Sequence, residues 1–101
     1  MTVQESFDHL VETVRGYNPS ANFDLIRSAF EFADKAHEGQ LRKDNSPFVT
    51  HPLAVAQIVA EELHLDSESI AAALLHDTIE DTAATHEQIA DLFSPTIANL
   101  V

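Results

Sequence analysis

The chain has 101 residues, which is enough for one domain with a modest core. Seventeen Asp and Glu residues against five Lys and Arg give a formal charge of -12, which repels nucleic acids and opposes any small anionic substrate unless a cation neutralises it locally. The absence of cysteine excludes disulfides and thiolate zinc sites, and no apolar run approaches ~18 residues, so we expect a cytoplasmic protein without a nucleic-acid or membrane partner.

Apolar residues recur at helical spacing through the first third of the chain. A first helix is predicted over residues 3–14, and the Gly-Tyr-Asn-Pro-Ser run at residues 16–20 ends it. A second is predicted over residues 23–36 and stops near Gly39, a residue suited to a helix C-terminus. The turn-forming residues of segment 40–49 then predict a loop.

The remaining helices are predicted from their capping signals. Thr50 is predicted to N-cap a third helix that has His51 in its first turn and turns Ile58 and Leu63 inward. Asp66 or Ser67 would cap a fourth helix, which continues through the apolar residues 70–75. The chain is therefore expected to be all-α at least this far.

Two short helices are predicted to follow. Thr85 and Gln88 resemble a capping box for a fifth helix with Leu92 facing the core. Ser94 and Pro95 open a sixth, in which residues 97, 100 and 101 look core-facing, and the chain stops there without a capping signal. The sequence thus predicts a bundle of about five to six helices that looks truncated.

Four ionisable residues lie within residues 76–81, directly after the apolar stretch. The adjacent pair His76-Asp77 can offer one metal an imidazole nitrogen and a carboxylate oxygen, a set that suits Mn, Fe or Zn. Antiparallel packing of the third and fourth helices would bring His51 beside this pair. The alternative is a helix end that meets water, with His51 a polar residue at a helix start; the pattern leaves both interpretations open.

Three segments resemble the N-terminal HD hydrolase domain of RelA/SpoT homologues, enzymes of the bacterial alarmone (p)ppGpp. They are residues 37–43 (HEGQLRK), 46–53 (SPFVTHPL) and 71–82 (AAALLHDTIEDT), in the order and near the spacing of that family. The resemblance implies an HD-domain-like helical bundle, with residues 1–19 as an N-terminal helix and linker and residues 20–101 as the HD motif region. The Gly-Tyr-Asn-Pro run at residues 16–19 is most similar to the long synthetase/hydrolase members.

The resemblance also implies roles for individual residues. They are Mn²⁺ binding by His51, His76 and Asp77, catalysis by Glu80 and Asp81, and binding of the guanosine polyphosphate by Arg42 and Lys43. The implied reaction is hydrolysis of the 3′-diphosphate of (p)ppGpp to GDP or GTP and pyrophosphate. Without the resemblance, the acidic pair would be an exposed pair before a turn, and the basic pair a solvated loop.

The other four histidines are predicted to have no catalytic role. His37 is expected to pack or cap near Gly39, and His9, His64 and His86 are expected on the surface.

The chain departs from the family in length. Family hydrolase domains run nearly twice as far, and a later helix supplies an aspartate as the fourth metal ligand, which is expected here beyond residue 101. This departure leaves open whether the chain alone is active, and an open apolar face at residues 97–101 is expected to favour self-association. Two alternatives remain: a non-catalytic helical module for interaction or regulation, and an HD phosphohydrolase that acts on another nucleotide.

Overall fold

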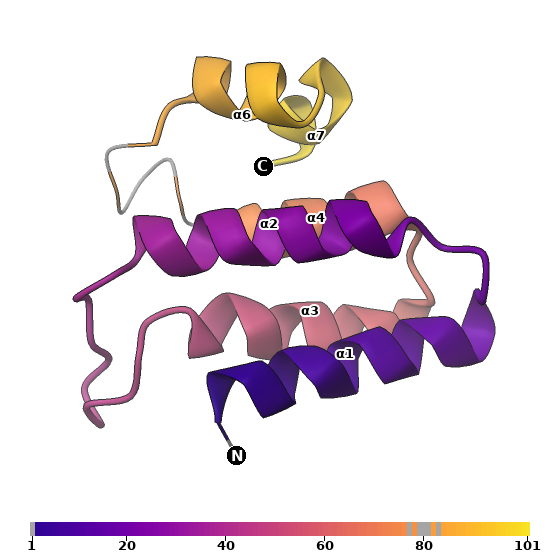
Figure 1. Cartoon of the computed structure of the whole chain (residues 1–101), viewed down its shortest axis with the longest axis horizontal. Coiled ribbons are helices and arrows are strands. Elements are labelled where there is room, and N and C mark those ends of the chain that lie inside the picture. Colours follow the sequence, from indigo (N-terminus) through magenta and orange to yellow (C-terminus); the bar gives the residue numbers. More distant parts are fainter. Residues whose placement is uncertain (1, 77, 79–81, 83) are drawn as a thin grey trace.

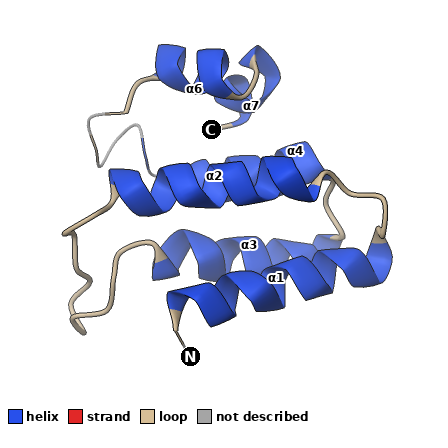
Figure 2. Cartoon of the chain, in the orientation of Figure 1, coloured by secondary structure: helices blue, strands red, loops and turns tan. Residues whose placement is uncertain are grey.

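The structure is a computed structural model that describes residues 2–76, 78, 82 and 84–101. Every regular element among them is a helix, which confirms the predicted all-α class (Figure 2). The helices are α1 (Val3–Tyr17), α2 (Phe23–Ala36), α3 (Thr50–Leu63), α4 (Ser67–Leu75), α6 (His86–Leu92) and α7 (Pro95–Leu100). None of these described helices is long and apolar enough to cross a membrane.

The helices are stacked in layers around α4. α1 packs against α3, and α2 packs against α4. α6 and α7 lie on the side of α2 and α4 that faces away from α1 and α3 (Figure 1). α4 contacts α2, α3 and α7, and five of its nine residues are buried. A helix surrounded in this way must be apolar on most of its faces, which explains the continuous apolar stretch at residues 70–75.

Most predicted helix starts are confirmed. The Asp66 side chain accepts a hydrogen bond from the backbone N–H of Ser69 at the start of α4. Thr85 and Gln88 form the predicted capping box of α6. At the start of α7, the Ser94 side chain accepts a hydrogen bond from the backbone N–H of Ile97, with proline next to Ser94. These starts depend only on residues within one turn, so the sequence is sufficient to find them.

The predicted N-cap of α3 is wrong. Val49 occupies that position with helical dihedral angles (φ -60°, ψ -18°) and makes no side-chain cap. The preceding residues already turn like a helix, since the Thr50 N–H bonds the Pro47 carbonyl at 3.1 Å. The Thr50 hydroxyl therefore points backward and donates to that same carbonyl at 2.7 Å.

Several apolar residues predicted to face the core are exposed. They are Ile58, Leu63, Leu92 and Leu100. α3 buries instead the face that carries Leu53, Ala56 and Ala60, because that face meets α1 and α4. Ile97 is buried, so the open face expected at the chain end is reduced chiefly to Leu100. Self-association stays a prediction.

Candidate functional site

The rings of two histidines from different helices lie together. His51 is in the first turn of α3, and His76 directly follows the last residue of α4. Their ring centroids are 5.6 Å apart with planes tilted by 56°. Both side chains are half-buried. Because α3 and α4 pack against each other and are joined by a short turn, the start of one lies beside the end of the other.

The hydrogen bond of His76 determines which nitrogen it can offer to a ligand. Its Nδ1 lies 2.6 Å from the carbonyl oxygen of Ala73. A carbonyl only accepts hydrogen bonds, so Nδ1 is the donor, and in a neutral ring Nε2 is then the nitrogen with the lone pair. Metal-binding histidines commonly donate their other ring N–H to a backbone carbonyl in this way. His76 is therefore oriented as a metal ligand would be.

The spacing of the pair also fits one shared ion. With metal–nitrogen bonds of about 2.1 Å, each ring centroid would lie roughly 3.2 Å from the ion, so two centroids could be up to about 6.4 Å apart. The observed separation of 5.6 Å is within this limit. His51 and His76 could thus bind a divalent cation as two of its ligands.

Three predicted site residues lie outside the described residues. They are Asp77, Glu80 and Asp81. Among the residues that the structure does describe, no group of three or more histidine, aspartate or glutamate side chains could hold a metal. The metal-binding and catalytic roles of all five acidic and histidine residues therefore stay predictions.

A loop with a basic tip lies between α2 and α3. The Phe48 N–H bonds the Gln40 carbonyl at 3.0 Å, and the Arg42 N–H bonds the Ser46 carbonyl at 2.9 Å, so segment 40–48 closes on itself. Asn45 makes the turn with φ 68°, a conformation that asparagine tolerates well. This closure holds Arg42 and its neighbour at the exposed tip of the loop.

The loop borders a hollow of about 510 Å³ that suits an anion. Arg42, Lys43, Asp44 and Phe48 are among its lining residues. Hydrogen bonds from the Ser46 hydroxyl and N–H lower the pKa of Asp44, which therefore offsets one of the two positive charges at neutral pH. Phe48 also lies edge-on to His51, with ring centroids 6.2 Å apart, so one lining residue of this hollow contacts the histidine pair.

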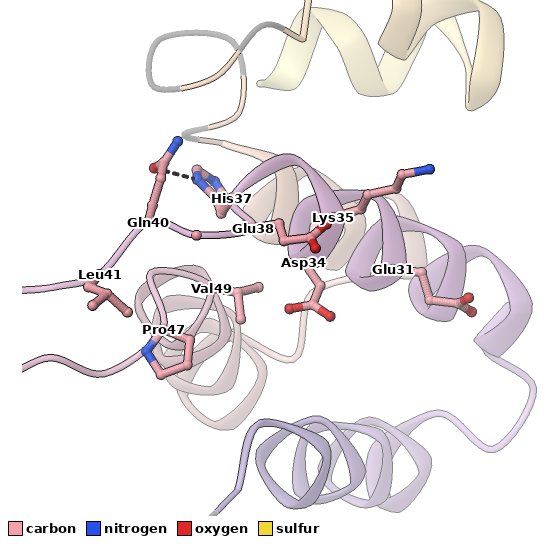
Figure 3. A pocket seen from close by; sticks show the side chains of 10 residues that line it. Glu31, Asp34, Lys35, His37, Glu38, Gln40, Leu41, Pro47 and Val49 are labelled. Atoms are coloured by element: carbon pink, nitrogen blue, oxygen red, sulfur yellow. Dashed lines mark hydrogen bonds between the residues drawn. The ribbon is translucent and has the colours of Figure 1, made fainter.

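A second hollow has the wrong charge for a phosphate ligand. It measures about 570 Å³ and lies between the end of α2 and the loop (Figure 3). Its lining includes the carboxylates of Glu31, Asp34 and Glu38 but only one cation, Lys35. Although it is the larger of the two, we favour the hollow at Arg42 as the substrate site.

Phe48 has no role predicted from the sequence, and its contact with His37 is not predicted either. His37 is 2% exposed, caps the end of α2 and stacks on Phe48 with centroids 4.6 Å apart, which confirms its predicted packing near Gly39. A signal was present, because His37 follows the buried Ala33 by four residues and so continues the buried face of α2. The three other histidines, His9, His64 and His86, are exposed as predicted.

The histidine pair and the basic loop lie within a region that matches a known family. The match is to the HD domain and covers residues 29–101. The chain belongs to the HD-domain family. Among curated relatives, this HD domain is 48% identical over 100 residues to a GTP pyrophosphokinase of Myxococcus xanthus. The aligned region covers 95% of the chain and 13% of the relative.

Two further relatives define the branch of the HD-domain family. The chain is 46% identical over 101 residues to the bifunctional (p)ppGpp synthase/hydrolase SpoT of Escherichia coli strain K12, covering 100% of the chain and 14% of the relative. It is 48% identical over 92 residues to the GTP pyrophosphokinase rsh of Brucella melitensis biotype 1, covering 91% of the chain and 12% of the relative. This HD domain is therefore a RelA/SpoT homologue that spans about an eighth of these relatives' length.

Proposed function

We propose that this HD domain hydrolyses the 3′-diphosphate of (p)ppGpp, giving GDP or GTP and pyrophosphate. The observation that carries the proposal is the pairing of His51 with His76, whose Nδ1 lies against the Ala73 carbonyl, near a hollow lined by Arg42 and Lys43. The name of the E. coli relative includes (p)ppGpp hydrolysis, and the identity of 46% along the whole chain supports the same substrate here.

His51 and His76, with Asp77, would hold one divalent metal, for which we propose Mn²⁺. When bound, the ion supplies positive charge beside the diphosphate and lowers the pKa of a water molecule. A mixed imidazole and carboxylate set suits such an ion. A chain with a formal charge of -12 needs this local positive charge to admit a polyphosphate substrate.

The basic loop would bind the phosphate oxygens. Arg42 can donate two parallel hydrogen bonds to one phosphate group, and Lys43 adds a compact positive charge. The backbone bonds that close the loop hold both residues on one exposed tip, so little ordering is needed when the substrate arrives.

Glu80 and Asp81 would move the protons of the reaction. The oxygen of a water molecule forms a bond to the phosphorus attached to the ribose 3′ oxygen, and the bond between that phosphorus and the 3′ oxygen breaks. One carboxylate takes a proton from the water, and the other, initially protonated, gives a proton to the departing 3′ oxygen. Repulsion between adjacent carboxylates favours one of them holding a proton.

The test is pyrophosphate release from (p)ppGpp by the purified chain in the presence of Mn²⁺. Release is expected to require the metal and to be lost in His76→Ala and in Glu80→Ala. His86→Ala is the matched control, since His86 is an exposed histidine on α6 and its loss should leave the rate unchanged.

Two results would contradict the proposal. One is a wild-type chain that binds metal but releases no pyrophosphate, and the other is a rate that survives both active-site substitutions. GTP, which lacks a 3′-diphosphate, should release none. Faster turnover of a different nucleotide would assign the domain to another substrate.

A further inference from the structure

His37 is a buried polar residue that the proposed reaction does not use. Its Nδ1 lies 3.2 Å from the side-chain oxygen of Gln40 (Figure 3). Its Nε2 is buried and has no hydrogen-bond partner among the residues that the structure describes. An unpaired buried nitrogen lowers stability, whereas phenylalanine or leucine could fill the space without this cost. A histidine at this position therefore calls for an explanation other than stability.

His37 contacts both ends of the basic loop. Its Nδ1 edge meets Gln40, where segment 40–48 begins, and its ring face stacks on Phe48, where that segment ends. The backbone bond from the Phe48 N–H to the Gln40 carbonyl joins these two ends directly. Gly39 makes the connection possible, because its φ of +84° lets the chain turn back so that Gln40 approaches the ring.

A series of ring contacts extends from His37 to the histidine pair. Phe48 lies 4.6 Å from His37 and 6.2 Å from His51, and His51 lies 5.6 Å from His76, all measured between ring centroids. Four rings thus form a continuous row from the end of α2 to the end of α4. Phe48 has ring contacts on two sides and so joins His37 to His51.

We propose that His37 is a positioning residue that orients both the basic loop and His51. Its polar edge holds the arm of the loop at Gln40, and its ring face holds Phe48 and, through it, the imidazole of His51. Neither phenylalanine nor leucine can do both, since the first lacks the polar edge and the second lacks the polar edge and the flat ring. The inference rests on the proposed function only for its activity readout.

Two substitutions separate the two contacts. His37→Phe keeps a ring against Phe48 and removes the polar edge, whereas His37→Leu removes both. Val14→Ala is the control for a general loss of packing, because Val14 is fully buried in α1, a helix that carries neither the loop nor a member of the histidine pair. The readouts are the imidazole NMR signals of His51, recorded on the metal-free chain, and the KM and kcat of pyrophosphate release.

His37→Leu is expected to shift the His51 imidazole signals by more than their line width, and His37→Phe is expected to leave them in place. Both variants should raise KM by about tenfold, because substituting a residue that supports the ligands of a site typically lowers affinity or activity by about this factor. Val14→Ala should lower the melting temperature without shifting the signals or KM. Phe48→Leu should by itself shift the His51 signals and should remove the further effect of His37→Leu.

Three results would overturn the inference. They are His51 signals that stay unchanged in a folded His37→Leu or Phe48→Leu chain, a wild-type KM in His37→Phe, and KM changes that follow the melting temperature as they do in Val14→Ala. The NMR comparison needs neither metal nor substrate. It therefore decides the effect on His51 even if the chain hydrolyses nothing, and so separates failure of this inference from failure of the proposed function.

Discussion

Each end of α3 has a histidine next to an aromatic ring, but the two pairs have different surroundings. At the C-terminal end, His64 stacks on Tyr17 with centroids 4.7 Å apart, and the Tyr17 hydroxyl donates to the Leu65 carbonyl at 2.6 Å. At the N-terminal end, His51 contacts Phe48 edge-on and lies beside His76. The pair of His64 and Tyr17 lies at the C-terminal cap of α3, whereas the pair of His51 and Phe48 lies next to a second histidine and a hollow with basic lining residues.

The comparison shows that a ring contact alone does not mark a functional site. His64 is exposed and caps α3 in the left-handed conformation, so its stack on Tyr17 is explained by the way the chain turns there. The distinguishing features at the other end are polar. His76 has a carbonyl partner that leaves its Nε2 with the lone pair, and the adjoining loop concentrates positive charge in a strongly acidic chain.

The largest expected effect concerns the leucines on the two ends of α3. Leu53→Ala should lower the free energy of unfolding by about 2–5 kcal/mol, because Leu53 is 2% exposed and its loss leaves a cavity. Leu63→Ala should change it by less than about 0.5 kcal/mol, since Leu63 is 64% exposed. Urea denaturation measures both, and equal losses would mean that α3 is packed differently.

A similar contrast is expected for the binding of Mn²⁺. His51→Ala should weaken binding by at least about 100-fold, or about 2.8 kcal/mol, because a ligand is removed. His64→Ala should leave the affinity unchanged. Isothermal titration calorimetry gives both values. Equal affinities in the two variants would place the metal elsewhere or show that His51 does not bind it.

Alanine substitution of the two glycines should change the free energy of unfolding in opposite directions. Gly39→Ala should destabilise the chain by about 1–2 kcal/mol, since its φ of +84° disfavours a side chain even though a Cβ would meet nothing within 4 Å. Gly16→Ala should stabilise it by about 0.5–1 kcal/mol, because Gly16 is helical and equally uncrowded. Thermal unfolding of both variants, compared with wild type, checks the signs.

A modest loss of stability is expected on substitution of Tyr17. Tyr17→Phe should cost about 1 kcal/mol through loss of the hydrogen bond to Leu65. Burial, and the negative charge of Asp66, raise the pKa of Tyr17 above its ordinary value of 10.0. The folded state therefore favours the neutral hydroxyl, so this contribution is fully present below pH 10 and is lost as the pH rises through the raised pKa.

The pH dependence of stability tests whether the ionisation of Tyr17 is coupled to folding. Unfolding of wild type measured between pH 9 and pH 11 should show a fall in stability that is smaller in Tyr17→Phe. Identical pH profiles would show that ionisation of Tyr17 is not coupled to folding.

The sequence was most informative where structure depends on near neighbours. The caps at Asp66, Thr85 and Ser94 were predicted because each acts within one helical turn. The prediction failed at Thr50, since its hydroxyl is engaged by a turn that begins at Pro47. It failed at Ile58 too, because periodicity gives an apolar stripe but not which neighbouring helix will cover it.

The candidate site also has features that the sequence indicates and others that only helix packing produces. The candidate residues could be read from the sequence, because His51 and the His-Asp pair lie at a predicted helix start and a predicted helix end and match motifs of the family that the chain resembles. The packing of the helices was needed to show that the rings of His51 and His76 lie 5.6 Å apart, that Nδ1 of His76 faces a carbonyl, and that His37 and Phe48 continue the row. The physical reason is that spacing along the chain fixes a residue's position on its own helix, whereas contact between helices depends on how their buried faces pack together.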